Sequence, residues 1–304
     1  MKTICELHEI LKKHNFCNVD AHIHTYLCDG GSDMNVKNIA EQALKKGLTC
    51  IILTPHFHKN VSDETTNLYT DTNEDILLQL RREVDKFKSE SKKDLTVLLS
   101  TEADILNING TTSLKLSKKA EDALDLVTPT VNYHPLLPLR AVEVTYSKRI
   151  TEIHSSGTYD AFAQKIGGVE KVLETLYETE VNAIINSPYP SILGHFFAAH
   201  SYVTEKYNWF GALPKHLDIM EEGADKIIDA CVKTGAMIDL TGIHCKTNRY
   251  DKKQNDDGFF YDFQKRFIQK CKKNNILIFP GSDAHATIGV GNIEYYRQKL
   301  YWEV

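Results

Sequence analysis

The sequence predicts an α/β fold in which parallel strands form a barrel. Short apolar segments alternate with amphipathic helical segments along most of the chain, which is typical of a parallel sheet built from βα units. There are seven such strand segments, and this number favours a barrel over an open sheet. A histidine or a carboxylate follows most of them, as expected where parallel strands deliver side chains to one rim.

The strand segments are short and apolar. They are Cys17–Ala21, Thr49–Thr54, Leu95–Ser100, Leu126–Val131, Ser191–Leu193, Ala236–Leu240 and Ile276–Pro280. Between most of them, apolar residues recur at three- and four-residue spacing, which predicts helices that bury one face. These helices are expected at Val36–Lys46 (ended by Gly47), Glu74–Lys88, Gly168–Asn186, Asp218–Thr234 and Phe260–Lys273.

Two stretches, about 136 to 158 and 198 to 214, fit neither period and are expected to be long loops over one face. In a compact barrel, loops of that length more often serve a binding site than the framework. The chain contains no internal repeat, low-complexity tract or Pro/Gly-rich linker. We therefore expect one barrel domain over residues 1–304, a length that suits this architecture.

Composition restricts the class of protein. The formal charge is -5 and no long basic run is present, which argues against nucleic-acid binding but allows a small phosphorylated substrate. The first residues lack an apolar signal core, and no segment approaches the roughly 18 apolar residues of a membrane span. The seven cysteines are widely spaced without a Cys-x-x-Cys pair, which indicates reduced thiols in a cytoplasmic protein.

Side chains that bind metals follow six of the seven predicted strands, and only the sixth strand was assigned none. In chain order they are His22, His24 and Asp29, then His56, Glu102, His134 and His195, and finally Asp283 with His285. A single histidine after a strand is more often a hydrogen-bonded loop residue than a ligand. The repetition of this coincidence at strand after strand predicts a metal centre at the carboxyl ends of the strands.

The ligand types indicate which ions would bind. His22 and His24 are two residues apart on an extended segment, so both project to one side and could chelate one ion. Imidazoles mixed with carboxylates suit Zn²⁺, Mn²⁺ or Fe²⁺ better than Mg²⁺ or Ca²⁺. A carboxylate such as Glu102 or Asp283 could bridge two ions.

These motifs resemble those of the PHP (polymerase and histidinol phosphatase) superfamily. The matching segments are His22-Ile23-His24-Thr25 with Asp29-Gly30, Thr54-Pro55-His56, Glu102, His134, Gly194-His195 and Ser282-Asp283-Ala284-His285. They run in family order over nearly the whole chain. The resemblance implies a distorted TIM-like (β/α)7 barrel with a trinuclear metal site.

The resemblance also implies which residues hold each ion. One ion would be bound by His22, His24, Glu102 and Asp283; a second by Glu102, His134 and His195; and a third by Asp29, His56 and His285. The expected cofactors are two or three divalent ions, Zn, Mn or Fe. Asp283, His285 and His195 are the expected catalytic residues, and the nucleophile would be a metal-bridging hydroxide.

The implied reaction is hydrolysis of a small-molecule phosphomonoester. Within the superfamily, the chain length and the middle section resemble the histidinol phosphatases, which convert L-histidinol phosphate and water to L-histidinol and phosphate. The similar segments are Gly167–Glu170, which opens a long helix, and Ile238–Gly242 before the last helix. Phosphate binding also needs cationic side chains, and Lys246, Arg249 and Arg140 on the rim loops are the candidates.

Three alternatives remain open. The substrate could be another small phosphoester, or the chain could be a protein-tyrosine phosphatase of the capsule-operon type, which Thr54-Pro55-His56 also resembles. A covalent cysteine mechanism is disfavoured, because a Cys-x5-Arg loop starting at Cys28 would need arginine where Met34 stands. The non-enzyme alternative is a catalytically inactive metal-binding interaction module.

Overall fold

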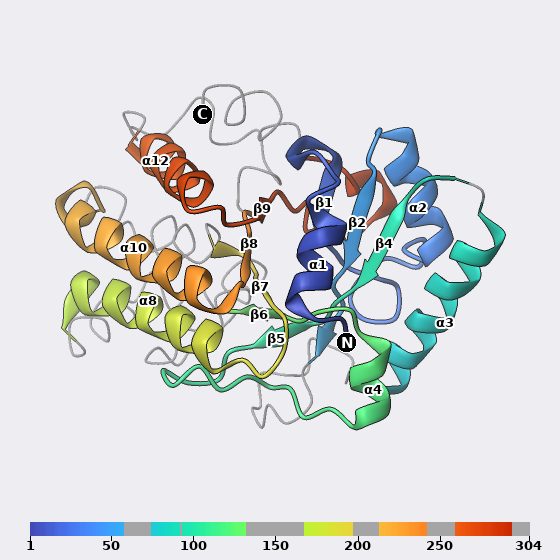
Figure 1. Cartoon of the computed structure of the whole chain (residues 1–304), viewed down its shortest axis with the longest axis horizontal. Helices are drawn as coiled ribbons and strands as arrows, with labels where there is room; N and C mark the ends of the chain where they lie inside the picture. Colours follow the sequence, from blue (N-terminus) through green and yellow to red (C-terminus); the bar gives the residue numbers. More distant parts are fainter. Residues whose placement is uncertain (58–73, 92, 132–166, 197–212, 242–258, 294–304) are drawn as a thin grey trace, which may run out of the picture.

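The computed structural model describes residues 1–57, 74–91, 93–131, 167–196, 213–241 and 259–293. Figure 1 shows strands in the middle, with α2 and α3 on one side and α8, α10 and α12 on the other. The helices are α1 (Ile4–Leu11), α2 (Val36–Lys45), α3 (Glu74–Glu90), α4 (Lys118–Ala123), α8 (Gly168–Asn186), α10 (Leu217–Thr234) and α12 (Phe259–Lys273). The strands are β1 (Val19–Ile23), β2 (Cys50–Leu53), β3 (His56–Phe57), β4 (Thr96–Leu99), β5 (Glu102–Asp104), β6 (Thr128–Thr130), β7 (Ile192–Leu193), β8 (Met237–Asp239) and β9 (Ile278–Phe279).

All seven predicted strand segments contain a strand, and the five predicted helices are present within two residues at each end. The first strand was predicted two residues too early. The Asn15 side chain accepts a hydrogen bond from the Cys17 amide and caps a 3-10 turn over Phe16–Asn18, so β1 begins only at Val19. The sequence analysis did not predict α1, although Thr3 and Glu6 form a capping box at its start.

The strands form three parallel sheets, with the orders β1-β2-β4, β3-β5-β6 and β7-β8-β9. Backbone hydrogen bonds also join neighbouring sheets. The Gly194 amide donates to Pro129 O at 2.9 Å, and the Ala21 amide donates to Pro280 O at 2.9 Å. The prediction of an α/β fold with parallel strands is therefore confirmed, whereas closure of the strands into a barrel stays a prediction.

Side chains from all seven strand segments meet in one apolar cluster. Its strand members are Val19, Ala21, Cys50, Ile52, Leu98, Leu126, Ile192, Met237 and Phe279. Leu7 and Leu11 of α1 belong to the same cluster and are fully buried. Helix α1 thus covers the apolar interior between the strands, on the side from which the chain enters β1.

A larger apolar cluster lies between the strands and the surrounding helices. Helix α2 contributes Val36, Ile39, Ala40 and Ala43, and α3 contributes Leu77, Leu80 and Val84, at the three- and four-residue spacing from which these helices were predicted. Within the described residues, no helix combines the length and the apolar character needed to cross a membrane.

Glu180 is a charged-type residue buried within α8. It is fully buried, and neither carboxylate oxygen has a hydrogen-bond partner among the described residues. Burial raises the pKa of this carboxyl well above its usual value. The folded state therefore holds a proton that the unfolded chain releases above about pH 4.3, so this group lowers stability as pH rises from there towards its folded-state pKa.

We predict that Glu180→Gln flattens this pH dependence, because glutamine does not ionise in the unfolded chain. Thermal unfolding should give nearly equal Tm values for the variant and the wild type at pH 5, and a Tm several degrees higher for the variant at pH 8. Glu178→Gln, on the exposed face of the same helix, is the matched control. Parallel pH profiles for Glu180→Gln and the wild type would contradict the prediction.

Candidate metal centre

Eight of the nine predicted ligands lie in the described residues, and all eight come together at the ends of strands. His22 is in β1 and His24 follows it, His56 begins β3, and Glu102 begins β5. His195 follows β7, while Asp283 and His285 follow β9. Asp29 reaches the cluster from the loop between β1 and α2. The remaining predicted ligand, His134, lies outside the described residues.

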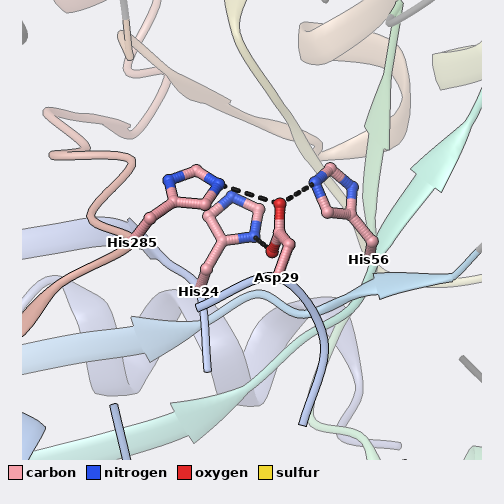
Figure 2. A group of neighbouring side chains, drawn as sticks. All are labelled: His24, Asp29, His56 and His285. Atoms are coloured by element: carbon pink, nitrogen blue, oxygen red, sulfur yellow. Dashed lines mark hydrogen bonds and ion pairs between the residues drawn. The ribbon is translucent and has the colours of Figure 1, made fainter. Parts of the chain in front are cut away.

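One group surrounds Asp29, and Figure 2 shows its carboxylate between three imidazole rings. Asp29 Oδ1 lies 3.0 Å from His24 Nδ1, and its Oδ2 lies 3.2 Å from His56 Nε2 and 2.9 Å from His285 Nε2. One ligand atom from each of the four residues lies within 4.8 Å of the others. The group contains the predicted third ligand set and adds His24 to it.

A second group surrounds Glu102, which is fully buried. Its Oε2 lies 3.2 Å from His22 Nε2, 3.1 Å from His56 Nδ1 and 3.6 Å from His24 Nε2. Two sets of ligand atoms here are within 4.8 Å of one another: His22, His24 and Glu102, and His22, His195 and Asp283. The four predicted ligands of the first ion are thus divided between two overlapping sets that share His22.

The backbone places two of these residues in an unusual conformation. His195 has φ 56° and Asp283 has φ 51°, in the left-handed region that only a few per cent of non-glycine residues adopt, although asparagine, aspartate and histidine do so more often than the others. Such conformations cost of order 1–3 kcal/mol and are found mostly at functional sites, where the surrounding structure holds them. Their occurrence at two expected catalytic residues agrees with a functional role for this cluster.

Gly30 allows the loop that carries Asp29 to fold back on β1. A Cβ at this position would lie 2.6 Å from the carbonyl carbon and oxygen of Thr25, closer than any side chain tolerates. The Gly30 amide donates to Thr25 O at 3.0 Å, and the Gly31 amide donates to His285 O at 2.7 Å. The Asp-Gly pair after the first strand is therefore explained by close packing of two loops.

Asp20 fixes the loop after β9, a role that the sequence analysis missed. Its Oδ1 accepts a hydrogen bond from the Ser282 amide and its Oδ2 accepts one from the Gly291 amide, both at 2.8 Å. Burial raises its pKa to about 6 in spite of these bonds. Because Ser282 directly precedes Asp283, Asp20 sets the position of a candidate ligand without belonging to the cluster.

The cluster holds Glu102 and Asp29 in the charged form. Burial by itself would raise the pKa of Glu102, but electrostatic interactions with His56 and His195 and the hydrogen bond with His22 hold it well below its usual range. Burial likewise opposes ionisation of Asp29, and His24 and His56 outweigh it, so its pKa is also strongly lowered. Both carboxylates therefore offer negative charge to a cation at neutral pH.

The histidines respond to the same charges in different ways. Burial opposes protonation of His22, but hydrogen bonds to Asp239 and Glu102 outweigh it and raise the pKa to about 10. Burial lowers the pKa of His195 to about 4, so its ring is neutral at pH 7. His195 Nε2 is buried and has no hydrogen-bond partner in the described part of the chain. A buried nitrogen normally has a partner.

These features fit bound divalent cations. The unpartnered His195 nitrogen and the close carboxylate–imidazole contacts are the arrangement expected of side chains that coordinate cations. The mixture of nitrogen and oxygen ligands suits Zn²⁺, Mn²⁺ or Fe²⁺. The number of ions and their identity do not follow from the ligands alone.

Asp239 is the functional residue that the analysis of strand ends overlooked. The sixth strand was assigned no ligand, yet it ends in Asp239, whose fully buried Oδ2 lies 2.9 Å from His22 Nδ1. An aspartate at the end of a predicted parallel strand was the available signal. The predicted phosphate-binding residues Arg140, Lys246 and Arg249 lie outside the described residues.

The parallel strands of this chain bring histidines and carboxylates into one buried cluster, an arrangement typical of metal-dependent α/β proteins. The model of the PHP domain family matches residues 20–242. The chain belongs to the PHP domain family.

The chain is also similar to individual members. It is 24% identical over 281 residues to the histidinol-phosphatase of Bacillus subtilis (strain 168), covering 90% of this chain and 95% of the relative. A crystal structure of hisK of Listeria monocytogenes, assigned as a histidinol phosphatase, matches with TM-score 0.58 and 14% identity, over 92% of this chain and 99% of that one. Histidinol phosphate phosphatase of Lactococcus lactis, in complex with zinc, L-histidinol and phosphate, matches with TM-score 0.53 and 14% identity, over 94% and 95%. The two crystal structures support the same fold.

We predict that Glu102→Gln loses bound metal, because a neutral amide replaces the carboxylate that lies closest to several imidazoles. Its divalent metal content after purification and dialysis, measured by mass spectrometry, should fall to less than half that of the wild type. Glu180→Gln, which replaces an equally buried glutamate in α8 outside the cluster, should retain the wild-type content. Equal metal content in all three proteins would show that Glu102 is no ligand.

Proposed function

We propose that this chain hydrolyses L-histidinol phosphate to L-histidinol and phosphate. Its family and its similarity to histidinol-phosphatases make it a metal-dependent phosphatase. The observation that carries the proposal is the cluster of five histidines and three carboxylates at the strand ends, in a chain that covers 95% of a histidinol-phosphatase. The zinc, L-histidinol and phosphate in the Lactococcus lactis complex support the substrate and the metal.

The three overlapping ligand groups support a trinuclear site. Each group contains at least three residues whose ligand atoms lie within 4.8 Å of one another. His22 and His24 each belong to two groups, as expected where neighbouring ions share ligands. We propose the nine residues of the sequence analysis as the ligand set, with His134 completing it.

The architecture proposed for this site is a single distorted (β/α)7 barrel over residues 1–304. Two observations support it: an interior cluster with members from all seven strand segments, and hydrogen bonds between β1 and the segment after β9. In such a barrel the ligand-bearing strand ends lie on one rim, with the apolar interior and α1 beneath them.

Bound divalent ions would acidify a water molecule and offset the negative charge of the phosphoryl group. The chain's own residues prepare the site for this chemistry. Glu102 and Asp29 keep their negative charge, since neighbouring histidines lower both pKa values. His195 stays neutral at pH 7 because burial lowers its pKa to about 4, so its ring offers a lone pair.

His285 lies on the accessible side of the cluster. Its side chain is 37% exposed, the largest value among the described candidate ligands. A substrate arriving from solvent therefore meets this ring before the buried members, and we propose His285, with His195 and Asp283, as the catalytic residues. Arg140, Lys246 and Arg249 remain the proposed contacts for the phosphate group.

The test is phosphate release from L-histidinol phosphate by protein reconstituted with Mn²⁺ or Zn²⁺. We expect kcat/KM of at least about 10⁴ M⁻¹s⁻¹, the range usual for enzymes on their own substrates. A negligible rate, in protein that still hydrolyses p-nitrophenyl phosphate, would reject the substrate but keep the phosphatase. Activity on tyrosine-phosphorylated peptide alone would instead support the capsule-operon alternative.

Asp283→Asn separates catalysis at this cluster from the inactive-module alternative. The substitution preserves the shape of the side chain but removes its charge beside His24, whose Nε2 lies 2.9 Å from Asp283 Oδ1. We predict that turnover of L-histidinol phosphate falls at least about 100-fold, as for the loss of one strong electrostatic contact in an active site. Unchanged turnover would exclude this cluster as the site of hydrolysis.

A further inference from the structure

Both carboxylate oxygens of Asp239 accept hydrogen bonds from other groups of the chain. Its Oδ2 accepts a hydrogen bond from His22 Nδ1 at 2.9 Å. Its Oδ1 accepts one from the Thr241 amide at 2.7 Å and another from the Thr241 hydroxyl. The side chain at the end of β8 is therefore held from one side by a turn of its own segment, and from the other by β1, 217 residues away in sequence.

His22 in turn has different neighbours on its two ring nitrogens. Nδ1 faces Asp239, whereas Nε2 lies 3.2 Å from Glu102 Oε2 and thus faces the centre of the proposed metal site. A neutral imidazole has one nitrogen that donates and one that accepts. A carboxylate can only accept, so Asp239 requires the proton on Nδ1, and a metal ion bound at Nε2 would take the place of the proton that faces Glu102.

Gly281, just after β9, provides the space for this arrangement. A Cβ on Gly281 would overlap the Thr241 hydroxyl, and it would lie 2.6 Å from His22 Cβ and 2.7 Å from Asp239 Oδ1. Three strand ends therefore meet at this point: β1 with His22, β8 with Asp239, and β9 with Gly281. The ring of His22 is fixed by the fold and not only by the ion that it would bind.

We propose that Asp239, supported by Thr241, is a positioning residue that sets the orientation and the protonated nitrogen of His22 for metal binding. This inference rests on the proposed metal-dependent function. Hydrogen bonds from a carboxylate to the distal nitrogen of a ligating histidine typically change metal affinity or activity 10–100-fold. Asp239 acts through His22 and not as a ligand: it contacts the ring nitrogen that faces away from Glu102, and it belongs to none of the three candidate ligand groups of the described residues.

Asp239→Asn tests this role with little change of shape. An amide has one oxygen and one NH2 group, whereas the carboxylate accepts hydrogen bonds on both sides. If the amide oxygen faces His22, the NH2 group faces the Thr241 amide; if it is turned round, the NH2 group faces His22 Nδ1. Either orientation opposes the present proton position on His22 or breaks the turn at Thr241.

Zinc affinity is the first measurement, made on metal-free full-length protein by competition with a chromophoric chelator. We expect Asp239→Asn to bind one zinc ion, the one that His22 would coordinate, about 10–100-fold less tightly than the wild type does. Thr241→Val should weaken binding to a smaller extent, and Thr241→Ser, which keeps the hydroxyl, should restore it.

Asp125→Asn is the matched control. Asp125 is also a buried aspartate that accepts a backbone hydrogen bond, from the Leu99 amide at 2.9 Å, but it pairs with Lys2 and Arg81 and not with a candidate ligand. We expect this variant to lose thermal stability and to keep the zinc affinity of the wild type. A loss of affinity equal to that of Asp239→Asn would show a general effect of destabilisation and overturn the inference.

Nitrogen-15 NMR of the histidine rings in the zinc-loaded protein provides a readout that a purely structural role would not change. His22→Asn identifies the His22 signals. In the wild type we expect the proton on Nδ1 and the metal on Nε2, and in Asp239→Asn we expect this Nδ1–H signal to be shifted or lost. An unchanged His22 tautomer in Asp239→Asn would overturn the inference.

Three further outcomes separate this inference from the function on which it rests. Complete loss of one zinc equivalent from Asp239→Asn, even at saturating zinc, would make Asp239 a direct ligand and reject the positioning role. Wild-type protein that binds no divalent cation would overturn the proposed function together with the inference. Wild-type protein that binds zinc, with Asp239→Asn binding it equally well, would overturn the inference alone.

Discussion

The burial of charged carboxylates among histidines is the constraint on which the rest of this structure depends. A buried carboxylate is costly unless positive charge and hydrogen bonds compensate for it. Glu102 is fully buried and has the rings of His22 and His56 within 3.2 Å. These side chains come from three different strand segments, so the strands must have one particular arrangement for the cluster to form.

The framework around the cluster is arranged to keep these positions. Asp20 accepts two backbone hydrogen bonds from the segment after β9, and so ties the loop of Asp283 to β1. Gly30 lets the loop of Asp29 approach the same strand. Below the cluster, the interior is apolar and is covered by α1, where Leu7 and Leu11 are fully buried. The polar ends of the strands thus hold the candidate site and the apolar interior contributes stability, a division that is common in parallel α/β folds.

The proposed chemistry follows from the same separation of charges. The carboxylates stay ionised and His195 stays neutral, so the cluster can offer both negative charge and lone pairs to cations at neutral pH. His22 differs from His195, because its hydrogen bonds to Asp239 and Glu102 raise its pKa to about 10. A metal must displace the proton on Nε2, and Asp239 determines that the other proton remains on Nδ1.

The sequence by itself determined seven strand segments, five of the helices, the candidate ligands and the family, because period and spacing are local properties of the chain. It also identified eight residues that the structure brings together, since the carboxyl ends of parallel strands share one side of a sheet. Only the tertiary structure decided which residues share a group, such as His24 with Asp29. It also decided which carboxylates hydrogen-bond to a candidate ligand or to its loop without belonging to a group, as Asp239 and Asp20 do. The contacts of Asp20 and Asp239 could not be assigned from local pattern, because their partners Ser282 and His22 lie more than 200 residues away and contact them only after folding.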